Sequence, residues 1–222
     1  MARLSALLVP MLAFGAGADV QTSIPAVEAA RALQAHYDTV RDFTADFVQT
    51  YTGGVIRKRL VEQGRLQVKR PGRMRWDYTQ PESKTFVSDG SQIYSYLPAD
   101  HQVYVSPMPG GDQATTAVLF LTGRGNLIRD FDVRYADGVT MPPTAAALRL
   151  DPKNAQRDYD WIVLVYDRDH LTIRSLIAHD SQGGTSAFEF HNLRENVGLS
   201  DKVFEFRIPR DAELIRGHTS SR

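Results

Sequence analysis

The sequence predicts a mainly β protein of the α+β class, built on one antiparallel sheet that curls. About ten segments alternate apolar and polar residues or form short apolar runs, and turn residues separate them at short intervals. Two segments have a helical pattern, and they do not alternate with the strands as they would in a parallel α/β sheet. A chain of 222 residues is long enough to bury the core of one such domain.

The N-terminal segment has the order of a secretory signal peptide. Arg3 precedes a short apolar run from Leu4 to Phe14, and small residues follow at Ala16-Gly17-Ala18. The run is shorter than the ~20 apolar residues that span a bilayer. We therefore expect residues 1–18 to be a signal peptide and residues 19–222 to be one exported domain. An apolar helix that stays attached is the alternative.

The first helix is expected over Pro25–Val40. Val27, Leu33 and Tyr37 fall near helical spacing, and proline is common in the first turn of a helix. This apolar side predicts a helix that packs on the sheet or covers a cavity.

The strands that follow alternate clearly. In Phe43–Tyr51, Phe47 and Gln49 share one face, because successive strand residues point to opposite faces. Two strands over Gly64–Tyr78 are joined at Arg70-Pro71-Gly72. The second of them has Met74, Trp76 and Tyr78 on one face and charged residues on the other. This apolar face must pack against something.

The rest of the chain continues as a meander of short strands. Asp89-Gly90 is a hairpin signal. Thr115–Thr122 is an apolar segment that fits a buried strand or a short helix, and Phe204, Phe206 and Ile208 are expected to close the sheet. Further strands are predicted at Thr85–Val87, Gln92–Leu97, Gln102–Ser106, Leu127–Tyr135, Ala146–Leu150, Trp161–Tyr166, Leu171–His179 and Thr185–Leu193.

The composition argues against several functional classes. A net charge of zero gives no field to attract nucleic acid. The absence of cysteine excludes disulfides, thiolate metal sites and a lipid-modified cysteine. The six histidines have no ligand spacing, and the sequence has no nucleophile elbow and no P-loop. We expect no catalytic residues, no metal and no cofactor, and a binding protein rather than an enzyme.

Several segments, taken in order, resemble the LolA family of periplasmic lipoprotein carriers. The run from Arg70 to Tyr78 followed by Ser88-Asp89-Gly90 is specific as a set, and the resemblance covers nearly all of residues 19–222. The other matching segments are Phe47-Val48-Gln49, Gly64-Arg65-Leu66, Ile93-Tyr94-Ser95-Tyr96, Gln102-Val103 and Phe204-Glu205-Phe206 with Pro209.

The resemblance implies an incomplete antiparallel β-barrel of ten to eleven strands around an apolar cavity for acyl chains. Short helices would lid the cavity, one at Pro25–Val40, with Val27, Leu33 and Tyr37, and one at Thr115–Thr122. Arg70 would be the latch that holds the empty carrier closed. The candidate lining residues are Phe47, Met74, Trp76, Tyr78, Phe86, Ile93, Tyr96, Leu119, Phe120, Trp161, Phe188 and Phe190. From periodicity alone, an ordinary core is the favoured interpretation of these side chains.

The resemblance also implies partners. A monomer in the periplasm would receive lipoproteins from the inner-membrane LolCDE transporter and pass them to an outer-membrane acceptor such as LolB. Three alternatives stay open at this point: a carrier of another lipid or glycolipid, a regulatory sensor that binds a protein, and a hydrolase.

Overall fold

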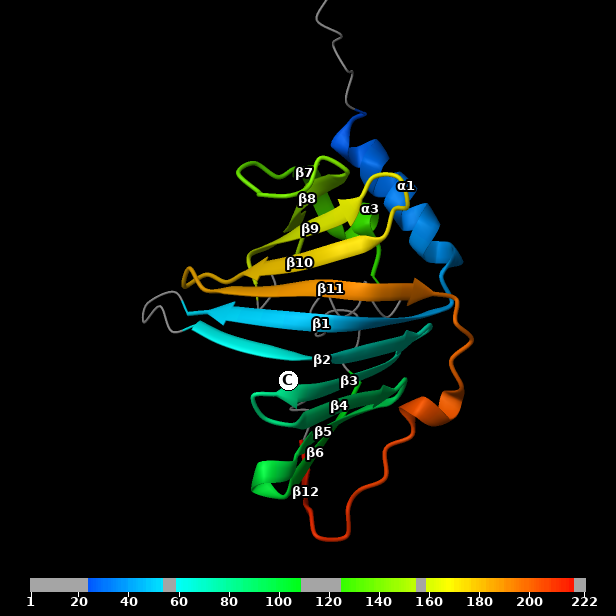
Figure 1. The fold of residues 1–222 in the computed structure, drawn as a ribbon, viewed down its shortest axis with the longest axis vertical. Coiled ribbons are helices and arrows are strands. Elements are labelled where there is room, and N and C mark those ends of the chain that lie inside the picture. The colour runs from blue at the N-terminus through cyan, green and yellow to red at the C-terminus, as the bar shows by residue number, and fades with distance from the viewer. Residues whose placement is uncertain (1–23, 54–58, 109–124, 155–158, 218–222) are drawn as a thin grey trace, which may run out of the picture.

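One large open sheet forms the protein (Figure 1). The computed structural model describes residues 24–53, 59–108, 125–154 and 159–217. Its twelve strands lie in the order β12-β6-β5-β4-β3-β2-β1-β11-β10-β9-β8-β7. The edge strands β12 and β7 do not pair with each other, so the sheet curls without closing. The mainly β, incomplete-barrel prediction is confirmed, with twelve strands in place of ten to eleven.

The elements agree with the predicted segments to within a few residues at most positions. The strands are β1 Asp42–Thr52, β2 Arg59–Lys69, β3 Arg73–Gln80, β4 Lys84–Asp89, β5 Gln92–Leu97, β6 Gln102–Pro107, β7 Phe131–Tyr135, β8 Ala145–Pro152, β9 Trp161–Asp167, β10 Ile173–His179, β11 Thr185–Glu195 and β12 Glu213–Arg216. The helices are α1 Ala26–Thr39, α3 Leu127–Asp130 and the 3₁₀ helices Pro98–Asp100 and Asp201–Phe204. The expected signal peptide and the Thr115–Thr122 segment lie outside the described residues.

The expected strand over Leu127–Tyr135 begins instead as the short helix α3. The Asn126 side chain accepts hydrogen bonds from the amides of Ile128 (3.0 Å) and Arg129 (2.8 Å). This is the capping interaction that starts a helix. The strand β7 therefore begins only at Phe131.

The expected closing strand at Phe204–Ile208 is wrong. The Ser200 hydroxyl caps the 3₁₀ helix Asp201–Phe204, and no strand follows until β12. β12 pairs with β6 in parallel, and all other pairs of the sheet are antiparallel. A parallel partner needs a long crossover, and the chain makes it by crossing the sheet (Figure 1).

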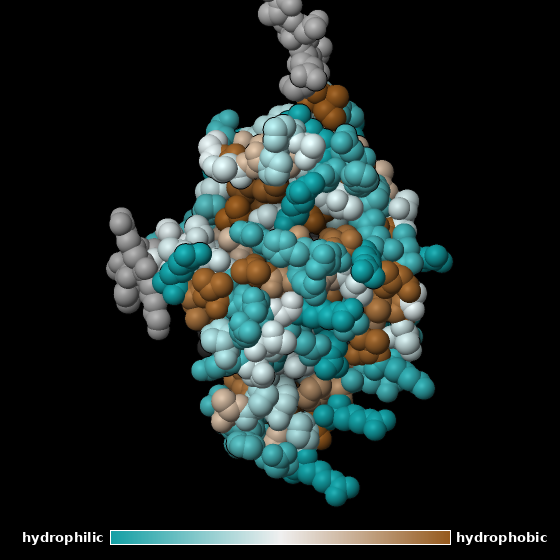
Figure 2. All heavy atoms as spheres, viewed as in Figure 1, coloured by the Kyte–Doolittle hydropathy of each residue, from teal (hydrophilic) through white to brown (hydrophobic). Residues whose placement is uncertain are grey.

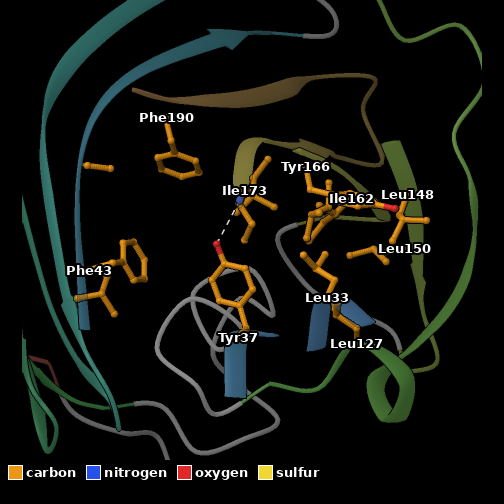
Figure 3. Packing of buried hydrophobic residues seen from close by; sticks show 14 of the residues in the cluster. Leu33, Tyr37, Phe43, Leu127, Leu148, Leu150, Ile162, Tyr166, Ile173 and Phe190 are labelled. Atoms are coloured by element: carbon orange, nitrogen blue, oxygen red, sulfur yellow. Dashed lines mark hydrogen bonds between the residues drawn. The ribbon is translucent and has the colours of Figure 1, made fainter. Parts of the chain in front are cut away.

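We call the sheet face that carries the main core cluster the inner face. Helices α1 and α3 contribute Leu33, Tyr37 and Leu127 to this cluster, where they meet Leu148 and Ile162 from the strands. Figure 3 shows Tyr37 rising from α1 between the aromatic and the aliphatic side of the cluster. Its hydroxyl accepts a 3.2 Å hydrogen bond from the Ile173 amide. The first predicted helix is therefore docked on the inner face.

The opposite, outer face is covered by the C-terminal segment over β3 to β5. Phe206 stacks on Tyr94 with ring centroids 5.4 Å apart. The Arg75 Nη1 donates to the carbonyl of Val203 (3.3 Å), and Asp201 pairs with two basic residues of the sheet. The C-terminal segment is therefore part of the fold.

No helix among the described ranges is both long enough and apolar enough to cross a membrane.

Candidate functional site: an aromatic inner face bounded by a polar belt

Aromatic rings from three strands meet at the centre of the inner face. Phe47 of β1 lies edge to face with Trp76 and Tyr78 of β3, at centroid distances of 5.0 and 4.8 Å. Phe188 of β11 lies 5.3 Å from Trp76, and Phe190 stacks on Phe188 at 6.5 Å. Edge-to-face and offset pairs are the favoured geometries of aromatic rings. We call these five side chains the aromatic cluster.

Gly64 makes the close contact between Phe47 and Tyr78 possible. It pairs with Phe47 on one side and with Tyr78 on the other. A Cβ at this position would overlap the carbonyl oxygen of Asp77 and lie 2.8 Å from the Tyr78 Cα. With no side chain between them, the two rings meet across the strand β2.

A group of polar side chains borders the aromatic cluster toward the end of β1. The Tyr78 hydroxyl donates to Gln49 Oε1 (2.7 Å), and Gln49 Nε2 lies 3.1 Å from the Ser186 hydroxyl oxygen. Lys84 Nζ donates to Glu62 Oε1 at 2.6 Å and lies 4.4 Å from the centroid of the Tyr78 ring. We call these five residues the polar belt.

Burial governs the electrostatics of the belt. It raises the pKa of the Tyr78 hydroxyl well above its ordinary value, and the nearby Glu62 carboxylate raises it further. Tyr78 therefore stays a neutral hydrogen-bond donor at every physiological pH.

The opposite end of the inner face is closed by the C-terminal end of α1. The Arg70 Nη1 donates to the Tyr37 carbonyl and lies 3.5 Å from the Val40 carbonyl. These are carbonyls of the last helical turn, where a cation also interacts favourably with the helix dipole. The His36 ring and the Glu195 carboxylate are 3.0 Å apart and hold the same end of α1 to β11.

The charge of Arg70 is partly withdrawn from solvent. Burial lowers its pKa from the ordinary value, and Asp38 and then Tyr37 act in the opposite direction. The ordinary pKa of an arginine is so high that the side chain stays protonated even when its pKa is lowered, so its charge is available to the helix carbonyls. The sequence resemblance names this residue, but no pattern in the sequence indicates its contact with α1.

A hollow of about 350 Å³ lies between the N-terminal half of α1 and the inner face of β7 to β9. Ala29 of α1, Tyr135 of β7 and Ala146 of β8 line it, together with Tyr166 and Leu171. Most of its accessible wall is apolar. Within the part of the chain that the structure describes, it gives the inner face apolar space beside the helix.

The predicted lining residues divide between the two faces. Those in or against the core cluster of the inner face are Phe47, Met74, Trp76, Tyr78, Phe86, Ile93, Phe188 and Phe190. Leu119 and Phe120 lie outside the described residues. Of the helix residues, Leu33 and Tyr37 are buried in the cluster, whereas Val27 is 38% exposed.

Tyr96 and Trp161 lie on the outer face, so they are not among the side chains that could line the inner face. Tyr96 contacts Phe206 of the C-terminal segment at a centroid distance of 6.0 Å. Trp161 packs with the second cluster, which contains Val163 and Val165. The large aromatic side chains of Tyr96 and Trp161 alone would predict that they lie with the other aromatic residues. Strand alternation from an inner residue, Ile162 in β9, puts Trp161 on the other side.

A second hollow, of about 450 Å³, surrounds Trp161 on the outer face. The Trp161 ring stacks on His179 at 3.4 Å, and the Arg149 guanidinium carbon lies 3.8 Å from the Trp161 centroid. Burial lowers the pKa of His179, and the neighbouring Arg149 lowers it further. Within the described ranges, acidic and histidine side chains form no group of three that could hold a metal ion.

The chain is similar in sequence to proteins of one family and shares its fold with a solved structure. The family model described as "Outer membrane lipoprotein carrier protein LolA" matches residues 38–207. An outer-membrane lipoprotein carrier protein of Methylobacillus flagellatus is 29% identical over 82% of this chain and 86% of its own length. One from Bordetella avium is 28% identical over 97% of each chain. An uncharacterized conserved protein of Thermus thermophilus shares the fold, with a TM-score of 0.56 at 13% identity over 85% of this chain and 99% of its own.

Proposed function

Because the chain belongs to the LolA family of outer-membrane lipoprotein carrier proteins, we propose that it carries lipoproteins by holding their acyl chains against the inner face of its sheet. The observation that supports this most is the aromatic cluster on a sheet that stays open. The hollow beside α1 adds apolar space next to that face. Carriage of this kind needs no covalent step, and the proposal includes no catalytic residue and no cofactor.

Energetics explains why the carrier must both hold and release its cargo. Burial of an acyl chain contributes about 0.8 kcal/mol per CH₂, so a sixteen-carbon chain is held in a membrane by roughly 12 kcal/mol. A lipoprotein can leave the membrane only for another apolar site. If α1 must move for the chain to enter, its contacts with Arg70 oppose binding and lower the net affinity. We propose this latch role for Arg70.

The proposed cellular location and partners follow from the family. Residues 1–18 direct export, the mature monomer of residues 19–222 works in the periplasm, and it takes cargo from LolCDE and delivers it to an acceptor such as LolB. The apolar inner-face residues contact the acyl chains, and the rest of the lipoprotein stays in water.

The experiment that tests this function identifies the natural cargo. The full chain is expressed with its signal peptide and purified from periplasm, and bound material is analysed by mass spectrometry after organic extraction and proteolysis. We expect acylated N-terminal peptides of lipoproteins. Free lipids alone would favour a carrier of another lipid. A protein that comes without cargo and also binds no apolar dye would contradict the proposal.

A further inference from the structure

The polar belt is unexpected on a surface that serves only hydrocarbon chains. Four of its residues lie directly beside the aromatic cluster on the same face, namely Gln49, Glu62, Lys84 and Ser186. The fifth, Tyr78, belongs to both groups. The side chains of Glu62 and Lys84 are only 11% and 24% exposed. A partly buried ion pair contributes little net stability, because desolvation of the two charges offsets their attraction. Stability alone therefore does not explain the belt.

The position of the belt matches the polar end of an acylated molecule. Along β1, successive inner positions go from Phe47, which is 1% exposed, through half-buried Gln49 to Tyr51, which is 41% exposed. Leu60, paired with Tyr51, is 40% exposed. Figure 2 shows one face of the molecule, with apolar atoms exposed beside the grey segment that joins β1 and β2.

The other end of the inner face is closed where α1 meets Arg70 and Glu195. A molecule whose chains lie on the aromatic cluster would therefore place its polar end at the belt.

The belt has hydrogen-bonding capacity left over. Lys84 has three N–H donors and uses one of them on Glu62. The Gln49 amide has two N–H groups and uses one of them on Ser186. The belt can thus donate further hydrogen bonds to the carbonyl oxygens of ester and amide groups.

The charge of the belt is balanced. Glu62 and Lys84 neutralise each other, so the belt offers no net positive charge to a ligand group that carries a full negative charge. Such a group would be partly desolvated there without a compensating charge, which is costly. Uncharged ester and amide groups meet no such penalty.

We propose that the polar belt binds the uncharged ester and amide groups that join the acyl chains to the N-terminus of the cargo protein, and that Glu62, by neutralising Lys84, keeps the belt from attracting the phosphate of a phospholipid. This inference rests on the proposed function. It adds a basis for selectivity: the aromatic cluster accepts any hydrocarbon chain, and the belt distinguishes a lipoprotein from the far more abundant phospholipids of the membrane.

The test compares two ligands with the same acyl chains, an uncharged triacylated cysteinyl peptide and phosphatidylglycerol. Both are titrated against bound N-phenyl-1-naphthylamine, a neutral apolar dye, and the ratio of their affinities is the readout. Glu62→Gln removes the neutralising charge and leaves Lys84 unpaired, so phosphatidylglycerol should bind about tenfold tighter while the peptide changes little. Lys84→Gln should weaken phosphatidylglycerol binding instead.

Two further variants complete the test. The double variant Glu62→Gln, Lys84→Gln is again neutral and should restore the wild-type ratio, which a general loss of packing would not do. Arg134→Gln, which breaks the outer-face pair with Asp151, should leave the ratio unchanged. If the wild-type protein binds the peptide but the ratio is the same in Glu62→Gln, the belt inference is wrong. If the wild type binds neither the peptide nor the dye, the proposed function itself is wrong.

Discussion

At the scale of single residues, Gly64 has the clearest structural requirement. The backbone of β3 lies so close that there is no room for a Cβ, and the ring contact between Phe47 and Tyr78 depends on this. The sequence alternation puts residue 64 on the inner face but does not show why it is glycine. Only the register of β2 against β3, with its irregularity between Gln63 and Gly64, supplies the reason.

We expect Gly64→Ala to destabilise the protein by about 1–3 kcal/mol or more, because overpacking forces backbone shifts. Urea unfolding followed by circular dichroism measures this. Gly217→Ala is the matched control, since its Cβ would meet only ordinary contacts at 3.6 Å or beyond. Equal stability of the two variants would contradict the close approach at Gly64.

Asp167 is a second residue whose contacts have a clear structural role. Its Oδ1 accepts from the amides of Asp169 (3.1 Å) and His170 (3.0 Å), and its Oδ2 pairs with Arg174. The hydrogen bond from Arg174, followed by those from His170, holds the pKa of this carboxyl well below its usual range. This is a turn-forming aspartate.

The lowered pKa of Asp167 predicts an acid-sensitive contribution to stability. The unfolded carboxyl titrates near pH ~3.9, so the contribution is complete above that pH and is lost as the pH falls toward the lower folded pKa. We expect Asp167→Asn to lower the melting temperature at neutral pH and to flatten its fall below pH ~4. Asp132→Asn, at an exposed position of β7, serves as control. A pH profile of Asp167→Asn parallel to that of the wild type would rule out this contribution.

At the scale of elements, α1 is held most firmly at its C-terminal end. Arg70, the His36–Glu195 pair and the hydrogen bond between Tyr37 and Ile173 all lie in its last turn or just beyond. The N-terminal half faces the hollow of about 350 Å³. The periodicity of the sequence predicts the helix and its apolar side, but these contacts come from residues far away in the chain.

We expect Arg70→Leu to loosen the last turn of α1 and to leave the open carrier more populated. Amide hydrogen exchange should become faster around Tyr37 and Val40. Acylated peptide should bind more tightly and pass to an acceptor more slowly, because the contact that opposes binding is gone. Arg31→Leu, on the exposed side of the same helix, is the control. Unchanged exchange, loading and hand-over in Arg70→Leu would exclude the latch role.

The C-terminal segment is the element that strand periodicity predicts least well. Phe204 is 1% exposed and Ile208 is 40% exposed, although periodicity puts both in one closing strand. We predict a loss of about 3–5 kcal/mol for Phe204→Ala, the range for truncation of a fully buried phenylalanine. Ile208→Ala should stay within about 0.5 kcal/mol of the wild type. Chemical denaturation of both variants checks this, and similar losses would mean that the segment is not anchored at Phe204.

At the scale of the whole molecule, the sequence predicts much of the fold and part of the site. Strand segments and turns are local properties, so most of them follow from alternation and turn residues. Membership of the inner or the outer face is not local, because alternation assigns two faces to each strand without saying which one meets the core. The prediction that Trp161 and Tyr96 line the inner face is wrong for this reason.

The make-up of the polar belt is also only partly a local property of the sequence. Gln49 can be assigned to the face of Phe47 by alternation alone. Lys84 and Glu62 come together only because β2 and β4 flank β3 in the sheet, so that their side chains meet across it. The parallel β12 likewise depends on a crossover that leaves no periodic signal.

The two tryptophans allow the central claim, that acyl chains bind on the inner face, to be measured directly. The sequence has only two, and they lie on opposite faces. Trp161→Phe leaves Trp76 as the only indole, and Trp76→Phe leaves Trp161. Each variant is titrated with a triacylated peptide whose chains carry bromine, a short-range quencher. We predict strong quenching of Trp76 and little change at Trp161. Quenching of Trp161 with Trp76 unaffected, or binding that quenches neither, would contradict the account.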